Sequence, residues 1–242
     1  MAMNRASFAK MLEPGLNTLF GLEYDSYPAE YEAVFESNTS QKAFEEDVLL
    51  AGFGSAPTKS EGSAISYDDA GQQWTARYQH ETVALAFSIT EEAEEDGQYG
   101  SIASRYTKAL ARSMASTKEI KAANVLNNAT SANIGDGTTL LSTSHPTQNG
   151  NQSNTLATAA DLSETSLEAI LIQIADMKDE RGLRIAAQGT KLVIPTAYTF
   201  VAERLLESQL RTGTADNDIN AIKSGGYLPG GYHVMRRLTD AD

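Results

Sequence analysis

The chain contains no cysteine, one tryptophan and three histidines among its 242 residues. Without cysteine it forms no disulfide bond, has no thiolate nucleophile and lacks the sulfur ligands of the usual zinc sites. It has no apolar run near the ~20 residues that a membrane-spanning helix needs. Its opening sequence, MAMNRASFAKMLEPG, lacks the long apolar core of a secretory signal. These absences predict a soluble cytoplasmic protein.

Positive charge is also scarce. The chain has 19 lysines and arginines against 32 aspartates and glutamates, for a net charge of −13. Because an acidic chain repels the phosphate backbone, the balance argues against a dedicated nucleic-acid-binding protein. The hydrophobic share of 41% is ordinary for a globular protein. A chain of this length can bury a sizeable core in one or two domains.

Sequence motifs of catalysis are missing. The three histidines, His80, His145 and His233, are scattered, and none pairs with a neighbouring acid at a diagnostic spacing. No glycine-rich phosphate loop and no G-x-S-x-G elbow occurs. The sequence therefore predicts that the protein is not an enzyme and has no catalytic residues.

Two acidic stretches resemble cation sites. Asp216-x-Asp218-x-Asn220 begins like a calcium loop, but Ala221 replaces the required glycine and no glutamate stands at the twelfth position. The run EEAEED at 91–96 either binds a cation or supplies carboxylates to the positive end of a helix dipole. The second interpretation is favoured, so we predict no metal site and no cofactor.

Residues 1–47 predict an N-terminal arm. A short helix over 6–20 is expected to break at Pro14-Gly15. Five aromatic residues are spaced through the rest of the segment: Tyr24, Tyr27, Tyr31, Phe35 and Phe44. The spacing of the middle three puts their rings on one helical face. The rings either pack on the chain's own domain or lie on a neighbouring subunit, and the second interpretation is favoured because little in this region forms a core alone.

Residues 48–90 predict a long β excursion. Strand signals occur at Val48–Ala51, Ile65–Tyr67, Gln73–His80 and, with the clearest alternation, Val83–Ile89. A two-stranded ribbon is marginally stable alone, so the excursion needs something to lie against, such as another subunit. At its Gly/Ser/Pro-rich tip, Lys59 either pairs with acids of a neighbouring subunit or is simply solvated. The candidate contacts of the excursion are Lys59, Glu61, Trp74 and Arg77.

The strongest helix signal runs from Gln98 to Asn128. Its apolar residues recur at helical intervals, at Ile102, Tyr106, Ala109, Leu110, Met114, Ile120, Ala123 and Leu126. A helix of this length is about 45 Å long, against an average of about 11–12 residues, and predicts a spine on which other elements pack. The polar stretch 127–160 predicts loops with one short strand, Thr138–Ser142.

The last third predicts a compact mixture of helices and strands. A helix over 162–180 is expected to start with a capping box at Thr165-x-x-Glu168 and to stop at Gly182. It carries an apolar stripe of Leu167, Ile170, Leu171, Ile174 and Met177. Further expected elements are a strand Leu192–Ile194, a helix Ala197–Leu210 with Phe200, Val201, Leu205 and Leu206 facing inward, a loop with one helical turn, and a strand Tyr232–Leu238.

Taken in this order, the segments resemble the major capsid proteins of tailed phages, most closely the Mu-like prophage major head subunit family. Each matching stretch is weak alone, but together they are fairly specific and cover most of the chain beyond residue 60. The stretches are EGSAISYDDA at 61–70, FSITEEAEEDGQYG at 87–100, NVLNNAT at 124–130, LLSTSHP at 140–146, KLVIPTAYTFVAERLLES at 191–208, RTGTADNDINAIKS at 211–224 and GYLPGGYHV at 226–234.

The resemblance implies an α+β fold of the Hong Kong phage capsid type. Its implied parts are an N-terminal arm (1–47), an extended β loop (48–90), a spine helix with the peripheral domain (91–155), an axial domain (156–230) and a return strand (231–242). In the axial domain the 211–226 loop would point to the centre of each ring of subunits. The candidate contacts of that loop are Arg211, Asp216, Asp218 and Lys223.

The resemblance also implies partners and a location. Copies of the chain would form hexamers and pentamers of an icosahedral shell that encloses double-stranded DNA without sequence-specific binding. Decoration, scaffold and portal proteins would be further partners, with no role for a membrane. The subunit would assemble in the host bacterial cytoplasm and reside in the virion. We expect the net charge of −13 to keep the inner wall from gripping DNA.

One departure from the family concerns the last residue, Asp242. Members of the family are expected to continue with further strands, so the contacts of those strands are in doubt here. Two other functions also stay open. An encapsulin-like nanocompartment would enclose an enzyme instead of DNA, and a soluble α/β enzyme of another family would be a monomer with a well-formed pocket.

Overall fold

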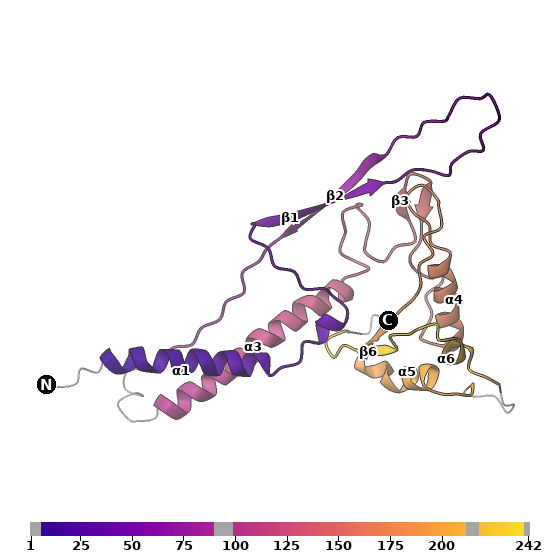
Figure 1. Ribbon diagram of the computed structural model, residues 1–242. Coiled ribbons are helices and arrows are strands. Elements are labelled where there is room, and N and C mark those ends of the chain that lie inside the picture. The colour runs from indigo at the N-terminus through magenta and orange to yellow at the C-terminus, as the bar shows by residue number, and fades with distance from the viewer. Residues whose placement is uncertain (1–5, 90–98, 212–217, 240–242) are drawn as a thin grey trace. The chain divides into compact units, whose positions relative to one another are not determined.

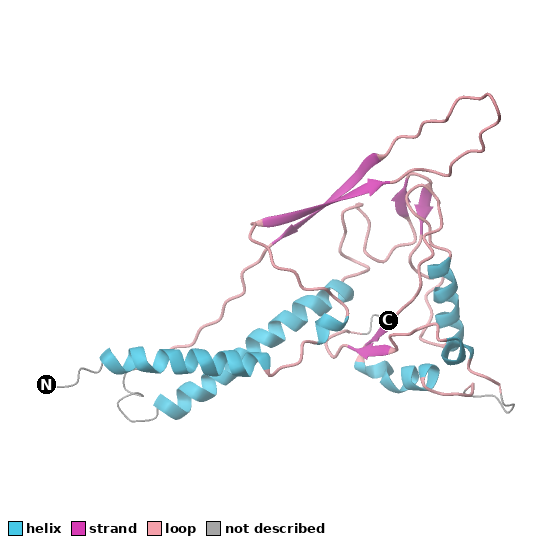
Figure 2. Cartoon of the chain, in the orientation of Figure 1, coloured by secondary structure: helices cyan, strands magenta, loops and turns pink. Residues whose placement is uncertain are grey.

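The computed structural model describes residues 6–89, 99–211 and 218–239, and the chain divides into two compact units (Figure 1). Unit 1 comprises Met1–Ser37 and Glu81–Asn124, and unit 2 comprises Asn38–His80 and Val125–Asp242. Both helices and strands are present, which confirms the predicted α+β class (Figure 2). Within the described ranges, no helix is long and apolar enough to cross a membrane.

Unit 1 begins with α1 (Ala6–Asp25), which continues through Pro14 and Gly15. The predicted break at this dipeptide is wrong. A proline inside a helix removes one backbone hydrogen bond and costs about 3 kcal/mol. The second half of α1 offsets that cost because Leu16, Leu19 and Phe20 lie on one half-buried face.

The aromatic segment after α1 is not an α-helix, so the predicted helical face of rings is wrong. Pro28 disfavours helical backbone at Tyr27, and the chain resumes only as the short 3₁₀-helix η1 (Glu30–Ala33). Tyr31, inside η1, is buried. The Glu119 carboxylate accepts a hydrogen bond from the Glu30 N–H at 2.8 Å, which holds η1 on the spine helix.

The spine helix α3 (Tyr99–Asn127) begins and ends within one residue of the predicted bounds. Its 29 residues span about 44 Å. The buried positions, mostly small and four residues apart, are Ala103, Thr107, Ala111, Glu119 and Ala123. The predicted apolar stripe is partly wrong because Tyr106 and Ile120 are exposed.

Residues 81–89 run alongside α3 without forming a strand, so the strand predicted at Val83–Ile89 is wrong. Glu81 pairs with Lys121 at 2.5 Å, and the Phe87 ring lies 5.8 Å from that of Tyr106. The fifteen helical positions from Tyr106 to Lys121 cover about 22 Å, and the six extended positions from Glu81 to Phe87 cover about 20 Å. Because the first residue of the segment contacts the end of the helix and the later residue contacts its beginning, the segment runs antiparallel to α3. Alternating residues form a strand only where a partner strand is available, and here the neighbour is a helix.

Unit 2 begins with an antiparallel ribbon of β1 (Phe44–Ala51) and β2 (Gly71–Gln79). Phe44 pairs with Gln79, Ala51 pairs with Gly71, and a bulge separates Val48 from Leu50. β1 starts inside the segment predicted as the arm. Residues 52–70 continue beyond both strands as an irregular loop, so the short strand predicted at 65–67 is wrong (Figure 1).

The stretch after α3 contains a small hairpin that the sequence did not predict, formed by β3 (His145–Thr147) and β4 (Gly150–Gln152). The strand predicted at 138–142 is wrong, since only Thr139 forms an isolated bridge there. The Thr138 hydroxyl and N–H bond instead to the Asp136 carboxylate. Polar side chains thus take the place of a β-ladder in this stretch.

Helix α4 (Glu164–Ala175) is shorter than predicted and has a different cap. Its capping box joins Ser163 to Ser166, not Thr165 to Glu168. The backbone at Gly182 has a φ of 87° and lies in a tight turn beyond the helix, so the predicted stop at this residue is wrong.

The core of unit 2 lies between α4 and the last elements. Strand β5 (Leu192–Ile194) forms as predicted and pairs in parallel with β6 (Tyr232–Val234), which ends earlier than expected. Between them come η2 (Thr196–Tyr198), α5 (Thr199–Leu206) and α6 (Ala221–Gly225), the expected helical turn. Leu167, Leu206 and Ile222 form the buried cluster.

Two expectations for α5 are wrong. Phe200 is 76% exposed instead of facing inward. The helix also ends at Leu206, because the buried Asn220 donates to the carbonyls of Leu205 and Ser208. Its amide oxygen accepts from the first N–H groups of α6, so one side chain joins the two helix ends.

Gly135 provides a test of how the ribbon is supported. A methyl group at this position would overlap the ring of Trp74 on β2, so Gly135→Ala should destabilise unit 2 by about 1–3 kcal/mol. Gly52→Ala, which meets nothing within 4 Å, is the control and should change stability little. Urea unfolding followed by fluorescence of Trp74, the only tryptophan, measures both. Equal stability of the two variants would refute this packing.

Candidate functional site

The chain leaves an unusually large surface open. Its accessible area is 17483 Å², whereas a compact monomer of 26.0 kDa exposes about 10,500 Å². Even two separate compact bodies with the sizes of the two units would expose only about 12,500 Å². The excess therefore arises within the units themselves and does not depend on how they are placed.

Part of this open surface is apolar and lies on the ribbon and its loop. Tyr67 is 94% exposed, Leu50 72%, Ile65 68% and Phe53 61%. Large apolar side chains as open to water as these are candidates for contacts with another macromolecule. The loop 52–70 is consequently the first candidate contact surface.

The arm aromatics predicted as subunit contacts pack within unit 1. The Tyr24 ring stacks on Phe20 at 5.9 Å, and the Tyr27 hydroxyl donates to Glu23 at 3.2 Å. The Lys118 ammonium lies 4.7 Å from the centre of the Tyr31 ring, and a hydrogen bond with the Tyr31 hydroxyl raises the pKa of Lys118. Tyr31 therefore packs on its own domain, the interpretation that the sequence favoured less.

Phe35 is half-buried in the same unit, and its N–H donates to the Tyr31 carbonyl at 2.8 Å.

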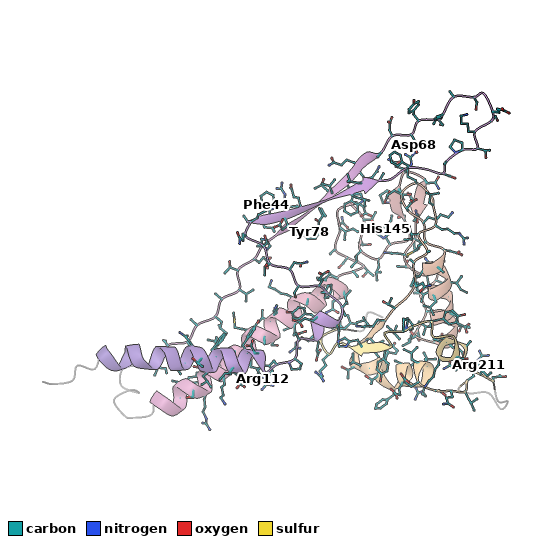
Figure 3. The ribbon with its side chains drawn as sticks, viewed as in Figure 1. Phe44, Asp68, Tyr78, Arg112, His145 and Arg211 are labelled. Carbon is teal, nitrogen blue, oxygen red and sulfur yellow. The ribbon has the colours of Figure 1, made fainter. Side chains whose placement is uncertain are left out.

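The four candidates on the β excursion fall into two pairs. Lys59 and Glu61 are exposed in the loop. Trp74 is half-buried over Gly135. Arg77 stacks on Phe44 at 4.5 Å and pairs with Glu46 at 2.5 Å across the two strands (Phe44 is labelled in Figure 3). The first pair is open to a neighbour, while the second stabilises the ribbon.

The described candidates of the 211–226 loop form contacts with neighbouring segments. Arg211 pairs with Glu164 of α4 at 2.7 Å, which raises the pKa of Arg211, and its N–H donates to the Asp218 carbonyl at 2.9 Å. Lys223 pairs with Glu207 at 3.2 Å. Asp216 and the acidic run 91–96 lie outside the described residues. Asp218 is itself exposed.

One polar cluster was missed by the sequence analysis. The Asp136 carboxylate lies 2.6 Å from Nδ1 of His145, and the Thr138 hydroxyl lies 3.0 Å from the same nitrogen (His145 is labelled in Figure 3). Burial pushes the pKa of Asp136 up, but the hydrogen bonds from His145 and Thr138 outweigh it and lower that pKa. No sequence signal links residues nine positions apart in a polar stretch.

This cluster does not have the geometry of a catalytic triad. In a triad the acid holds one imidazole nitrogen and the nucleophile contacts the other. Here the carboxylate and the hydroxyl both face Nδ1, and Nε2 of His145 is buried with no hydrogen-bond partner in the described structure. The cluster instead closes the loop before β3.

The groove beside α4 also lacks the chemistry of a reaction centre. This groove of about 590 Å³ between α4 and α6 is lined mainly by apolar side chains, among them Leu171, Ile172 and Ile222. Glu168 is its only charged lining residue. Among the residues that the structure describes, no group of three histidine, aspartate or glutamate side chains is placed to hold a metal ion.

Comparison with known proteins identifies the architecture. Residues 73–241 match the model of a family described as phage capsid protein. No curated protein matches the chain in sequence. In three dimensions the chain is similar to the capsid of bacteriophage JBD30, with a TM-score of 0.66 and 13% identity over 88% of this chain and 92% of that one.

Two further structures of the same phage are similar. The capsid decorated with minor capsid protein trimers gives a TM-score of 0.65 at 15% identity, over 88% of this chain and 92% of that one. The procapsid gives 0.64 at 14% identity, over 97% of this chain and 99% of that one. At such low identity the likeness establishes the fold, and it confirms the predicted capsid fold. The match covers 92%, 92% and 99% of these three capsid chains.

The Asp136 cluster yields a pH prediction. Because the folded pKa of Asp136 lies below its ordinary value of 3.8, its contribution is present above that pH and is lost as pH falls through the folded pKa. Asp136→Asn should lower the unfolding free energy by about 1–3 kcal/mol at pH 7. The gap to the wild type should shrink in acid. Urea titrations at several pH values measure it, and a gap that widens in acid would refute the assignment.

Proposed function

The chain belongs to the phage capsid protein family and is a structural capsid subunit, and on that premise we propose that it builds an icosahedral shell of hexamers and pentamers. The supporting observation is the accessible area of 17483 Å², about 5,000 Å² more than compact bodies of these sizes expose. Neighbouring copies would cover this surface. Many modest contacts repeated by symmetry then stabilise the closed shell.

In this proposal the β ribbon and its loop 52–70 lie over an adjacent subunit. The exposed apolar side chains of the loop would lose their water there, each contributing on the order of 2 kcal/mol. Residues 1–47 act as an arm, 91–155 carry the spine and peripheral domain, 156–230 form the axial domain and 231–242 return to the periphery. Lys59 and Glu61 are the open polar candidates for contacts between subunits, and Arg211, Asp218 and Lys223 would hold the axial loop in position.

Neither alternative function is supported. The family match and the capsid structures do not favour a nanocompartment shell or an unrecognised enzyme. The position of His145 and the apolar groove beside Ile222 also give no reaction centre. The family places the protein in the virion capsid.

We propose further partners on the same basis. The decorated JBD30 capsid carries minor capsid protein trimers, so decoration is a role that a second protein would fill here. Scaffold and portal proteins and the double-stranded DNA cargo belong to the same proposal, as does assembly in the host bacterial cytoplasm. The net charge of −13 suits a container that repels its cargo instead of binding it.

The first test of this function is electron microscopy of the purified chain, in which we expect closed shells. Ile65→Ser with Tyr67→Ser should abolish most shells while leaving the melting temperature unchanged, because both side chains are exposed in the single chain. Thr58→Ser, in the same loop, is the matched control and should assemble normally. A wild-type chain that stays monomeric over a wide concentration range would refute the proposal.

The second test concerns DNA. The unassembled subunit should bind double-stranded DNA more weakly than about 10⁻⁴ M at physiological salt, because its net charge repels phosphate. Fluorescence anisotropy of a labelled duplex measures the affinity. Binding that strengthens steeply as salt is lowered would reveal a basic inner surface and contradict the repulsion.

A further inference from the structure

The loop 52–70 is fastened at its base by one carboxylate. Asp68, on the returning side of the loop, accepts a hydrogen bond from the Gly54 N–H on the outgoing side at 2.8 Å. The same carboxylate accepts from the Arg181 guanidinium at 2.5 Å. Arg181 also donates to the Gln148 side chain beside β3 at 2.8 Å. Figure 3 shows Asp68 where the loop passes the β3 end of the unit.

Arg181 is itself held in place by the turn that carries it. The Asp179 carboxylate accepts from the N–H groups of Arg181 at 2.9 Å and Leu183 at 2.7 Å. Gly182 supplies the positive φ of 87° that this turn requires. The turn therefore fixes the backbone from which the guanidinium reaches Asp68 and Gln148. This reduces the conformational entropy that Arg181 loses when it forms these two hydrogen bonds.

This contact contributes little to folding. The Arg181 side chain is 24% exposed and that of Asp68 is 41% exposed, and surface ion pairs add about 0–1 kcal/mol. The Gly54 N–H and Arg181 hold the pKa of Asp68 below its ordinary range, so the carboxylate is charged at neutral pH. The contact instead restricts the conformational freedom of the loop 52–70. Within 52–70, regular structure is absent and the other hydrogen bonds are local, between Ser60 and Ser63 and from the Asp69 backbone to the Asp68 carboxylate.

We propose that Arg181 is a positioning residue for assembly, which fixes the direction in which the loop 52–70 presents Ile65 and Tyr67 to a neighbouring copy. The inference rests on the proposed function. A loop that is free in the monomer loses conformational entropy when it binds, and a loop that is already oriented loses less. Arg181 thus lowers the free energy cost of each contact that the loop makes with a neighbouring subunit.

The first experiment measures the loop in the monomer. Because the chain has no cysteine, Thr58→Cys in the loop and Ala169→Cys on α4 carry the only two spin labels. Pulsed electron resonance should give a narrow distance distribution with Arg181 present. Arg181→Asp should broaden it markedly, and Arg181→Lys, which keeps the charge but not the fork, should broaden it less. An unchanged distribution in Arg181→Asp would overturn the proposal.

The second experiment measures shells. Arg181→Asp should lose most of the shell yield at an unchanged melting temperature. The matched control is Arg184→Asp, which breaks the 2.8 Å pair with Asp176 on the same turn and should assemble like the wild type. Equal yields of Arg181→Asp and the wild type, or an equal loss in the control, would overturn the positioning role. A wild type without shells would refute the proposed function instead, and the spin-label distances would still decide for or against Arg181.

Discussion

The apolar surface that the chain cannot bury within itself governs its architecture. Its buried cluster in unit 2 is small, built around Leu167, Leu206 and Ile222, while Tyr67 and Ile65 on the extended loop stand in water. Large apolar side chains are most often buried in folded proteins. Here the hydrophobic free energy is available to contacts between copies, which is what a shell subunit of the phage capsid protein family requires.

Since the core is small, polar side chains fix the backbone over long stretches. Asn220 joins the end of α5 to the start of α6, and Asp179 holds the turn that presents Arg181. Asp136 and His145 close the loop before β3. Each is a buried or partly buried hydrogen-bond contact between segments or within a turn, with net contributions near 1 kcal/mol. Such contacts fix the path of the backbone more than they add to the free energy of unfolding. The loops are therefore ordered although no apolar core supports them.

The sequence predicted the elements whose signals are local. The spine helix follows from apolar periodicity over eight turns, and β5 follows from an apolar run that ends at Pro195. Several of the failures come from partners that are distant in sequence, although the local signals at Pro14-Gly15 and Thr165-x-x-Glu168 also failed. The alternating apolar residues at 83–89 lie beside a helix instead of a partner strand. The contact between Asp136 and His145 corresponds to no sequence pattern. Phe200 was expected to face inward with the other apolar side chains of its helix, whereas its 76% exposure suits a subunit surface.

The way the loop 52–70 is held shows why polar contacts suit a protein that must assemble. If Ile65 and Tyr67 were packed against their own chain, the loop would be ordered but its binding surface would be consumed. If nothing held the loop, the surface would be free but each contact would carry the entropy of ordering nineteen residues. A hydrogen-bonded ion pair at the base, between Asp68 and Arg181, restricts the loop without covering its apolar side chains. Packing in an apolar core would order the loop only by burying its apolar side chains. The ion pair at the base lets the loop be ordered while these side chains stay exposed.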